Sequence, residues 1–164
     1  MAMIDGMLME LEFEAGNTRK VLERVPLEHF DWKPHEKSME MGRLASHVAD
    51  IPGWVAMILN ADFLDVDTDY HPFSASSTEE LVATFDAKIA EAKSVMPGYS
   101  DEKLLQNWAL RSGGQEMFSM PRAQHIRGFV LSHTIHHRAQ LGMYLRLKDI
   151  PVPSIYGPSA DEQP

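Results

Sequence analysis

Three of the eight histidines in this 164-residue chain fall within five residues of one another, in the stretch SHTIHHRAQ. His133 and His137 are four residues apart, so in a helix their imidazoles lie one turn apart on the same face. Both rings can then reach a single cation, although a zinc-type site needs at least one more ligand. The spacing therefore predicts a metal site if a third ligand meets this face.

His47 is the histidine best suited to be that third ligand. It lies between Leu44 and Ile51 on the apolar face of another predicted helix. Burying three histidines without partners would cost about 1–3 kcal/mol each, so one shared metal is more favourable than three separate hydrogen-bonded histidines. Hydrogen-bonded core histidines and helix-surface histidines stay open as alternatives. The remaining histidines lie in linkers or near a helix start: His29, His35, His71 and His125.

Two residues beside this cluster are candidates for proton transfer, although no general base is obvious. Asp50 follows His47 by three residues and is either a group that orients a ligand, a base, or a solvated carboxylate at the helix edge. His136 lies at the edge of the apolar face, where it could shuttle protons or bond to a neighbour. Arg138 points off this face, and we expect it to pair at the surface.

Three further side chains share the histidine-bearing faces and could line a substrate pocket. Gln140 lies two turns after His133 and could orient a ligand or a water molecule. Trp54 and Tyr144 could contact a substrate. The alternative is that the two aromatic residues are core residues and that Gln140 satisfies a core hydrogen bond.

Composition excludes several classes of function. The chain has no cysteine, which excludes disulfides, thiolate ligands and a cysteine nucleophile. HExxH, GxSxG and Walker motifs are absent from the sequence. The net charge of −9, with no basic stripe, argues against nucleic acid as a partner and favours a neutral or cationic small molecule.

No segment of the sequence is typical of export or membrane insertion. The longest apolar run, Trp54 to Leu59, is too short to span a bilayer. The acidic N-terminal stretch does not resemble a signal peptide. We therefore expect a cytoplasmic protein without a membrane partner.

Four amphipathic segments must position the histidines. Apolar residues recur every three or four positions, which predicts helices. Pro52 should kink the second helix, and Ser77 with Glu80 forms a capping box that starts the third. These features predict one all-α domain, a four-helix bundle over residues 1–164. The helical ranges are about 4–25, 39–59, 77–96 and 122–147.

Three other segments connect or follow these helices. Residues 60–76 are long enough for a crossover connection. Residues 99–120 contain Gly113-Gly114 between partly apolar runs, which predicts either a short hairpin or a mobile lid. The proline-rich tail, residues 149–164, should be extended and pack back on the helices.

A second non-polar strip runs along the far side of the last helix. Its members are Gly128, Leu131, Ile135 and Gly142, with Ala139 beside them. Small residues allow another helix to approach closely, so we predict a homodimer packed on this strip. The alternative is that residues 99–120 or the C-terminal tail cover it.

Four stretches resemble the DinB-like (YfiT-like) family: NTRKVLERVP, FDWKPHEKSMEMGRLASHVADIPGW, LSHTIHHRAQLGMYLRL and PVPSIYGPSADE. The resemblance implies an up-down-down-up four-helix bundle with long second and third connections. It also implies one divalent metal, nickel or zinc, bound by His47, His133 and His137. Relatives are commonly homodimers. Some use low-molecular-weight thiols in transferase or isomerase reactions, and many are assigned as metal-dependent hydrolases.

Three functional hypotheses follow. The first is a metal-dependent hydrolase or thiol-dependent transferase acting on a small molecule, with an open coordination position. The second is a metal- or ligand-binding protein without turnover. The third is an interaction module that uses the far side of the last helix and binds no metal.

Overall fold

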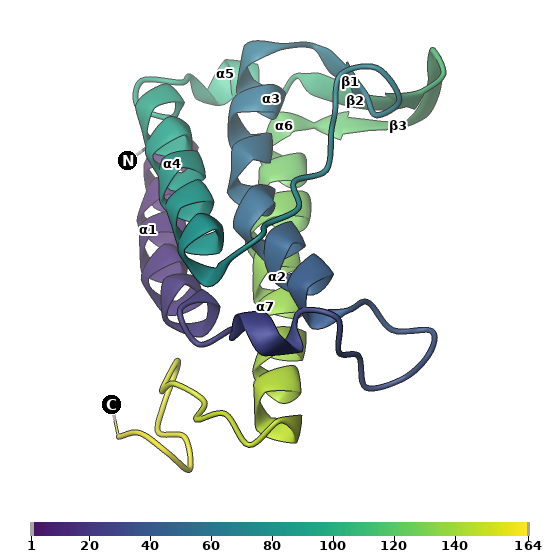
Figure 1. Ribbon diagram of the computed structural model, residues 1–164. Coiled ribbons are helices and arrows are strands. Elements are labelled where there is room, and N and C mark those ends of the chain that lie inside the picture. Colours follow the sequence, from purple (N-terminus) through teal and green to yellow (C-terminus); the bar gives the residue numbers. More distant parts are fainter. Residues whose placement is uncertain (1, 164) are drawn as a thin grey trace.

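The computed structural model describes residues 2–163, which are mostly helical with a small sheet at one end (Figure 1). The all-α prediction was therefore wrong in one respect, because it lacked the sheet. The helices are α1 (Met3–Leu22), α2 (Met41–Asp50), α3 (Trp54–Asn60), α4 (Thr78–Val95), α5 (Asp101–Leu104), α6 (Arg122–His125) and α7 (His133–Leu147). The strands are β1 (Phe63–Asp65), β2 (Asn107–Ser112) and β3 (Gln115–Pro121).

The long helices begin and end where local chemistry requires it. A 3-10 turn, Ile51–Gly53, separates α2 from α3, and it contains the Pro52 that was predicted to disturb the helix. The Ser77 hydroxyl accepts the Glu80 amide at 3.1 Å and caps α4, as predicted. Within residues 2–163, the helices lack the combination of length and apolar character that a membrane crossing requires.

The helices pack so that α2 and α7 meet near the middle of the molecule. Each of α1 and α2 contacts both α4 and α7. In the view of Figure 1 the chain runs down α1, up α2–α3, up α4 and down α6–α7. The classification as a four-helix bundle stays a prediction.

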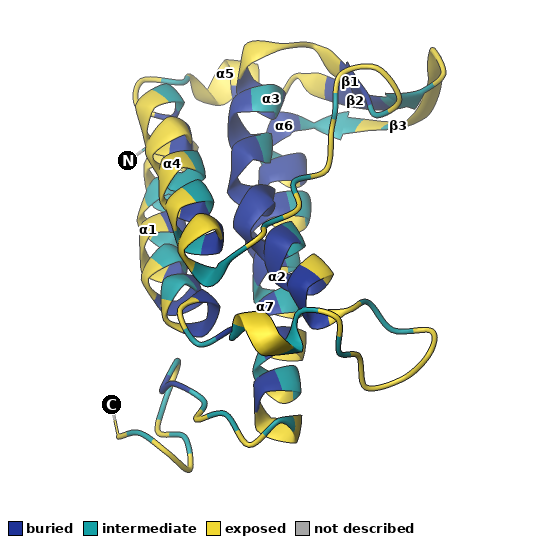
Figure 2. Ribbon diagram, viewed as in Figure 1, coloured by how far each residue is buried: buried dark blue, intermediate teal, exposed yellow. Residues whose placement is uncertain are grey.

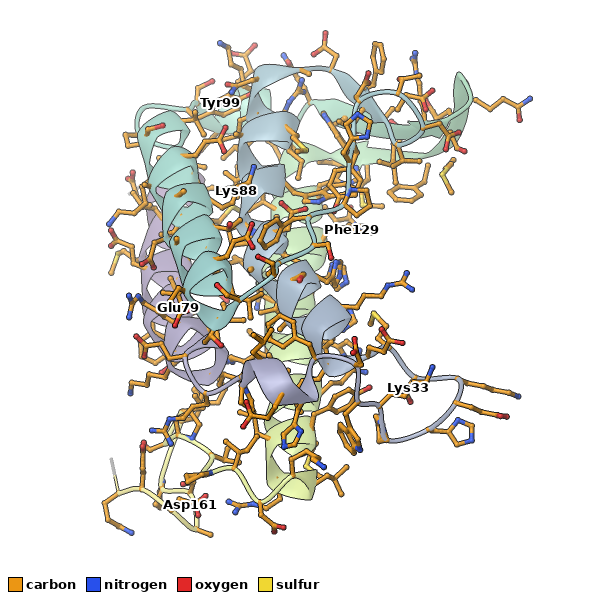
Figure 3. The ribbon with its side chains drawn as sticks, viewed as in Figure 1. Lys33, Glu79, Lys88, Tyr99, Phe129 and Asp161 are labelled. Atoms are coloured by element: carbon orange, nitrogen blue, oxygen red, sulfur yellow. The ribbon has the colours of Figure 1, made fainter. Side chains whose placement is uncertain are left out.

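Burial differs between the inner and outer helices (Figure 2). Most residues of α2 and α3 are buried, whereas α1 and α4 bury one face. One core cluster joins the sheet to the helices around Ile58 and Trp108, and the other surrounds Leu44 and Phe85. Exposed charged side chains lie on the outside of the helices and loops in Figure 3, including Lys33, Glu79 and Asp161.

Residues 99–120 form a hairpin, which was one of the two predicted alternatives. β2 pairs antiparallel with β3 and parallel with β1. Gly113 and Gly114 form the turn, with positive φ angles of 57° and 78°. The Asp65 carboxylate accepts the amides of Gly114 at 2.6 Å and Gly113 at 3.2 Å, and these bonds lower its pKa. The three residues of β1 are too few for an alternating pattern, so the sequence did not reveal the strand.

The last long helix contains a π-helical segment, Ile126–Ser132, between α6 and α7. At its end the amide of His133 bonds to the carbonyl of Gly128, five residues earlier. A π-helical turn contains more residues than an α-helical turn. A helical-wheel projection at about 100° per residue therefore gives wrong directions for the side chains before His133. Leu131 was predicted on the outer strip of this helix, but it is only 1% exposed and belongs to the core. That prediction was wrong.

Arg138 was predicted to pair at the surface, and this was also wrong. Its side chain is buried at 3% exposure and donates to the Glu14 carboxylate on α1 at 2.6 Å. It also donates to the Thr18 hydroxyl at 3.1 Å and, from its other terminal nitrogen, to the Tyr156 hydroxyl at 2.6 Å. Arg138 therefore joins α7 to α1 and to the C-terminal tail. The tail residues Ile150, Val152 and Ile155 pack against the same end of the core.

The buried pair between Arg138 and Glu14 predicts a large stability loss in Arg138→Met. This substitution leaves the carboxylate without its cation, so we expect the free energy of unfolding to fall by about 3–5 kcal/mol in urea denaturation. The control is Arg127→Met, whose arginine makes a more exposed pair with Glu10. It should change stability by less than about 1 kcal/mol. Similar small losses in both variants would contradict the role assigned to Arg138.

Candidate metal centre

His47, His133 and His137 converge in the structure, although 86 residues separate the first two. His47 lies in the last turn of α2, and the other two lie in the first turns of α7. One potential ligand nitrogen from each ring lies within 4.8 Å of the others. The contact between α2 and α7 therefore brings together the three histidines that the sequence singled out.

Hydrogen bonds on the outer side of two rings orient them toward this meeting point. The Nδ1 atom of His137 lies 2.7 Å from Gln140 Oε1, an oxygen that can only accept, so His137 donates from Nδ1. His133 Nδ1 likewise lies 3.3 Å from the carbonyl oxygen of Phe129. Each ring then presents an unprotonated Nε2. Bonds of this kind set the tautomer of histidine ligands in metal sites.

The three imidazoles are neutral near pH 7. Burial is the main cause that lowers the pKa of each, and neighbouring histidines add to it. The pKa of His47 falls to about 4. Neutral imidazole is the form that binds a metal, so the environment favours the protonation state that a ligand needs.

One pair of these nitrogens has the separation expected for two ligands of a divalent metal. His47 Nε2 and His133 Nε2 are 3.3 Å apart. Two nitrogens bound tetrahedrally to one zinc at about 2.0–2.1 Å are separated by about 3.3–3.4 Å. Two unprotonated nitrogens that face each other at this distance repel, unless a proton or a cation lies between them. The donor set is nitrogen only, which suits zinc and nickel.

A cavity of about 260 Å³ opens beside His47. Trp54, which was predicted to line a pocket, lies in its wall and packs against Tyr70 with ring centroids 5.2 Å apart. Most of the wall comes from α2 and from the connection between β1 and α4. The lining residues are Met39, Arg43, His47, Asp50, Trp54, Tyr70, Pro72 and Phe73.

Two other residues predicted for the pocket, Gln140 and Tyr144, do not line the cavity but contact residues of the site. Gln140 bonds to His137, as described above, and is exposed on its other side. Tyr144 donates its hydroxyl to the Met39 carbonyl at 3.2 Å and packs edge-on against Trp32. Tyr144 therefore braces a wall residue of the cavity and belongs to the core, which was its predicted alternative.

Asp50 is a buried group of this cavity, so the alternative of a solvated carboxylate was wrong. It is 5% exposed, and its Oδ2 accepts the Tyr70 hydroxyl at 2.7 Å. Burial and the bond to Asp50 raise the pKa of Tyr70 to about 12, so Tyr70 keeps its proton. Sequence reasoning missed Tyr70 and Phe73. Their only signal was the unusual length of the connection 60–76.

His136 lies outside the convergent group. It is exposed, and its ring centroid is 4.8 Å from that of His137. With His133 it borders a shallow depression on the outer side of the π-helical segment. His136 is therefore open to solvent beside the convergent histidines.

The strip predicted for dimerisation is partly occupied by the chain itself. Gly128 is exposed, and Ile135 and Gly142 are half-buried. The tail lies along this side of α7 and leaves a cavity of about 340 Å³, which is lined by Ile135, Ala139, Gly142, Val152 and Ile155 among others. The alternative that the tail covers the strip therefore applies to its C-terminal half. Pairing of two chains here stays a prediction.

The three histidines predict a specific pattern of metal loss. Purified without a histidine tag, the wild type should hold about one divalent metal per chain by elemental analysis. His47→Ala, His133→Ala and His137→Ala should each reduce this severalfold, because two remaining imidazoles hold a metal weakly. His136→Ala is the matched control and should retain the metal. A metal-free wild type, or equal loss from the control, would contradict the site.

Acid should destabilise the metal-free protein. An unfolded histidine has a pKa of about 6.5, and the folded pKa values are lower, so the unfolded chain takes up protons first as the pH falls. The stability from neutral His47 is complete above about pH 6.5 and is lost down to its folded pKa of about 4. Thermal unfolding of chelator-treated wild type between pH 7.5 and 4 should show a steeper decline than for His47→Gln. Parallel curves would refute this assignment.

Comparison with known proteins agrees with this architecture. A curated relative, the uncharacterised protein YrdA of Bacillus subtilis, is 26% identical over 159 residues, covering 97% of this chain and 91% of its own length. A solved DinB-like protein from Bacillus cereus has a TM-score of 0.69 at 21% identity, covering 93% of this chain and 97% of that one.

Two further solved structures share the fold. The DinB-like protein YjoA of Bacillus subtilis has a TM-score of 0.69 at 15% identity, covering 90% of this chain and 96% of that one. A protein assigned to the DinB family from Exiguobacterium sibiricum has a TM-score of 0.67 at 17% identity, covering 98% and 97%. The model of the DinB family matches residues 3–164, nearly the whole sequence. The chain therefore belongs to the DinB family.

Proposed function

We propose that this chain binds one divalent metal, zinc or nickel, through His47, His133 and His137, and uses it as a hydrolase or a thiol-dependent transferase acting on a small molecule. The observation that carries the proposal is the convergence of three neutral imidazoles beside a cavity. Three protein ligands leave further coordination positions open, which is typical of catalytic sites. The comparisons support the fold and the family, and the reaction rests on the donor set.

A divalent metal held in this way would supply Lewis acidity that acidifies water or a thiol at an open position. The residues of the chain have complementary tasks. Gln140 and the Phe129 carbonyl keep Nε2 of His137 and His133 free of protons. Trp54, Phe73 and Met39 exclude bulk water from one side of the cavity.

Asp50 is the strongest candidate for a base in this proposal. It is the only carboxylate among the residues that line the cavity, and it lies one turn after His47 on α2. Tyr70 bonds to Oδ2, which leaves Oδ1 to accept a proton from a substrate or from water. Tyr70 keeps its own proton and therefore orients the carboxylate.

The same bond favours a second candidate function, a metal-binding protein without turnover. One oxygen of the Asp50 carboxylate is already engaged by the Tyr70 hydroxyl, as expected of a group with a structural role. In that case the histidines and Asp50 would stabilise the packing of α2 on α7.

Asp50→Asn distinguishes the two candidates. The metal-loaded wild type is screened for hydrolysis of small esters and amides and for thiol transfer to electrophiles. In the catalytic case chelation abolishes the rate, and Asp50→Asn lowers kcat by about 10²–10⁴-fold while the metal content is unchanged. The amide can still accept the Tyr70 hydrogen bond, so the fold should persist. Turnover that survives chelation would overturn the proposal, and an inactive but metal-loaded wild type would support the second candidate.

A further inference from the structure

We propose that Arg43 makes the cavity beside the metal centre selective for a small, largely apolar molecule that carries one carboxylate. This inference rests on the proposed function, because the ligand would occupy the same cavity. It differs from the expectation drawn from the net charge of −9, which favoured a neutral or cationic molecule.

Arg43 is a solvent-exposed residue that also lines the cavity. It lies four residues before His47 on α2, so the two side chains occupy one face of the helix, and both line the cavity. A group bound by Arg43 would therefore lie next to the metal centre.

Among the described residues, the Arg43 side chain makes no hydrogen bond or ion pair within the chain. Acidic residues outnumber basic ones, 24 to 15, so a partner would be easy to provide. Six other arginines have a carboxylate partner: Arg19, Arg24, Arg122, Arg127, Arg138 and Arg146. Lys33, on the loop before α2, lies 3.8 Å from Glu40. The guanidinium of Arg43 is thus the cation of this region that is left for a ligand.

The other groups of the cavity that could donate to an anion are already engaged. Tyr70 donates to Asp50 at 2.7 Å, and His47 belongs to the metal centre. The first amides of α2 are also used, because Met41 donates to the Trp32 carbonyl and Gly42 to the Phe30 carbonyl. An anion at this end of α2 would therefore depend on the guanidinium, whose planar fork matches a carboxylate.

The remaining wall defines the rest of the ligand. Met39, Trp54, Pro72 and Phe73 present thioether, aromatic and aliphatic surface. The volume of about 260 Å³ is below the range of about 300–1,000 Å³ that is usual for drug-sized ligands. An aryl or short alkyl group with one carboxylate fits both the chemistry and the size of this cavity.

The test compares 3-phenylpropionate with its neutral amide, 3-phenylpropanamide, by isothermal titration calorimetry. Each probe is added to wild type, Arg43→Gln, Arg43→Lys and Arg19→Gln, in metal-loaded and chelator-treated form. Arg19→Gln is the matched control, because it removes one positive charge from an exposed pair on α1. Circular dichroism and elemental analysis verify the fold and the metal content of each variant.

Wild type should bind the carboxylate at least about tenfold more tightly than the amide, with or without metal, since a charge-assisted fork is lost in the amide complex. In Arg43→Gln the two probes should bind with about equal affinity. Arg43→Lys should keep part of the preference, and Arg19→Gln should leave it unchanged. An unchanged preference in Arg43→Gln would overturn the inference. So would a preference that disappears on chelation alone, because the metal would then be the group that holds the carboxylate.

The two proposals fail in different ways. If the wild type carries no metal, the proposed function fails, but the chelator-treated comparison still tests Arg43. If the metal is present and the wild type binds neither probe, or binds both equally, the role of Arg43 is overturned and the metal centre is unaffected.

Discussion

The candidate site depends on one constraint, the fixed orientation of α7 about its own axis. Arg138 points from α7 to α1, where the Glu14 carboxylate and the Thr18 hydroxyl surround its guanidinium. An unpaired charge at this depth would be costly, so α7 cannot turn without breaking the pair. With Arg138 held on α1, His133 and His137 face α2 and meet His47. A structural ion pair on one face of the helix thereby orients the two histidines on another face.

Interruptions of regular helix also position the site. α2 ends at Asp50, two residues before Pro52, and the chain resumes as α3 with Trp54 in the cavity wall. The π-helical segment before α7 shifts the register, so that Leu131 enters the core and the Phe129 carbonyl lies beside the His133 ring. π-helical turns are often found at functional sites, because the extra residue redirects side chains and carbonyls.

The net charge of the whole chain does not describe the charged groups at the candidate site. The chain is acidic, yet the cavity is lined by one imidazole of the three-histidine cluster, one arginine and a single carboxylate that is bonded to a tyrosine. Most other arginines pair with carboxylates, whereas Arg43 lines the cavity. Net charge is therefore a guide to non-specific partners such as nucleic acid, and a poor guide to a ligand held within a few ångströms of particular residues.

The sequence by itself determined the long helices, the break at Pro52, the Ser77 cap and the three histidines, because each rests on helical periodicity or on neighbouring residues. It also carried the resemblance to the DinB family. Only the tertiary structure decided that Arg138 is buried, that Leu131 faces inward, that β1 joins the hairpin and that Tyr70 and Phe73 complete the cavity. These features depend on contacts between distant segments and on a local change of helical pitch. Neither leaves a periodic signal in the chain, so they become visible only once α2, α7 and the connection 60–76 are packed together.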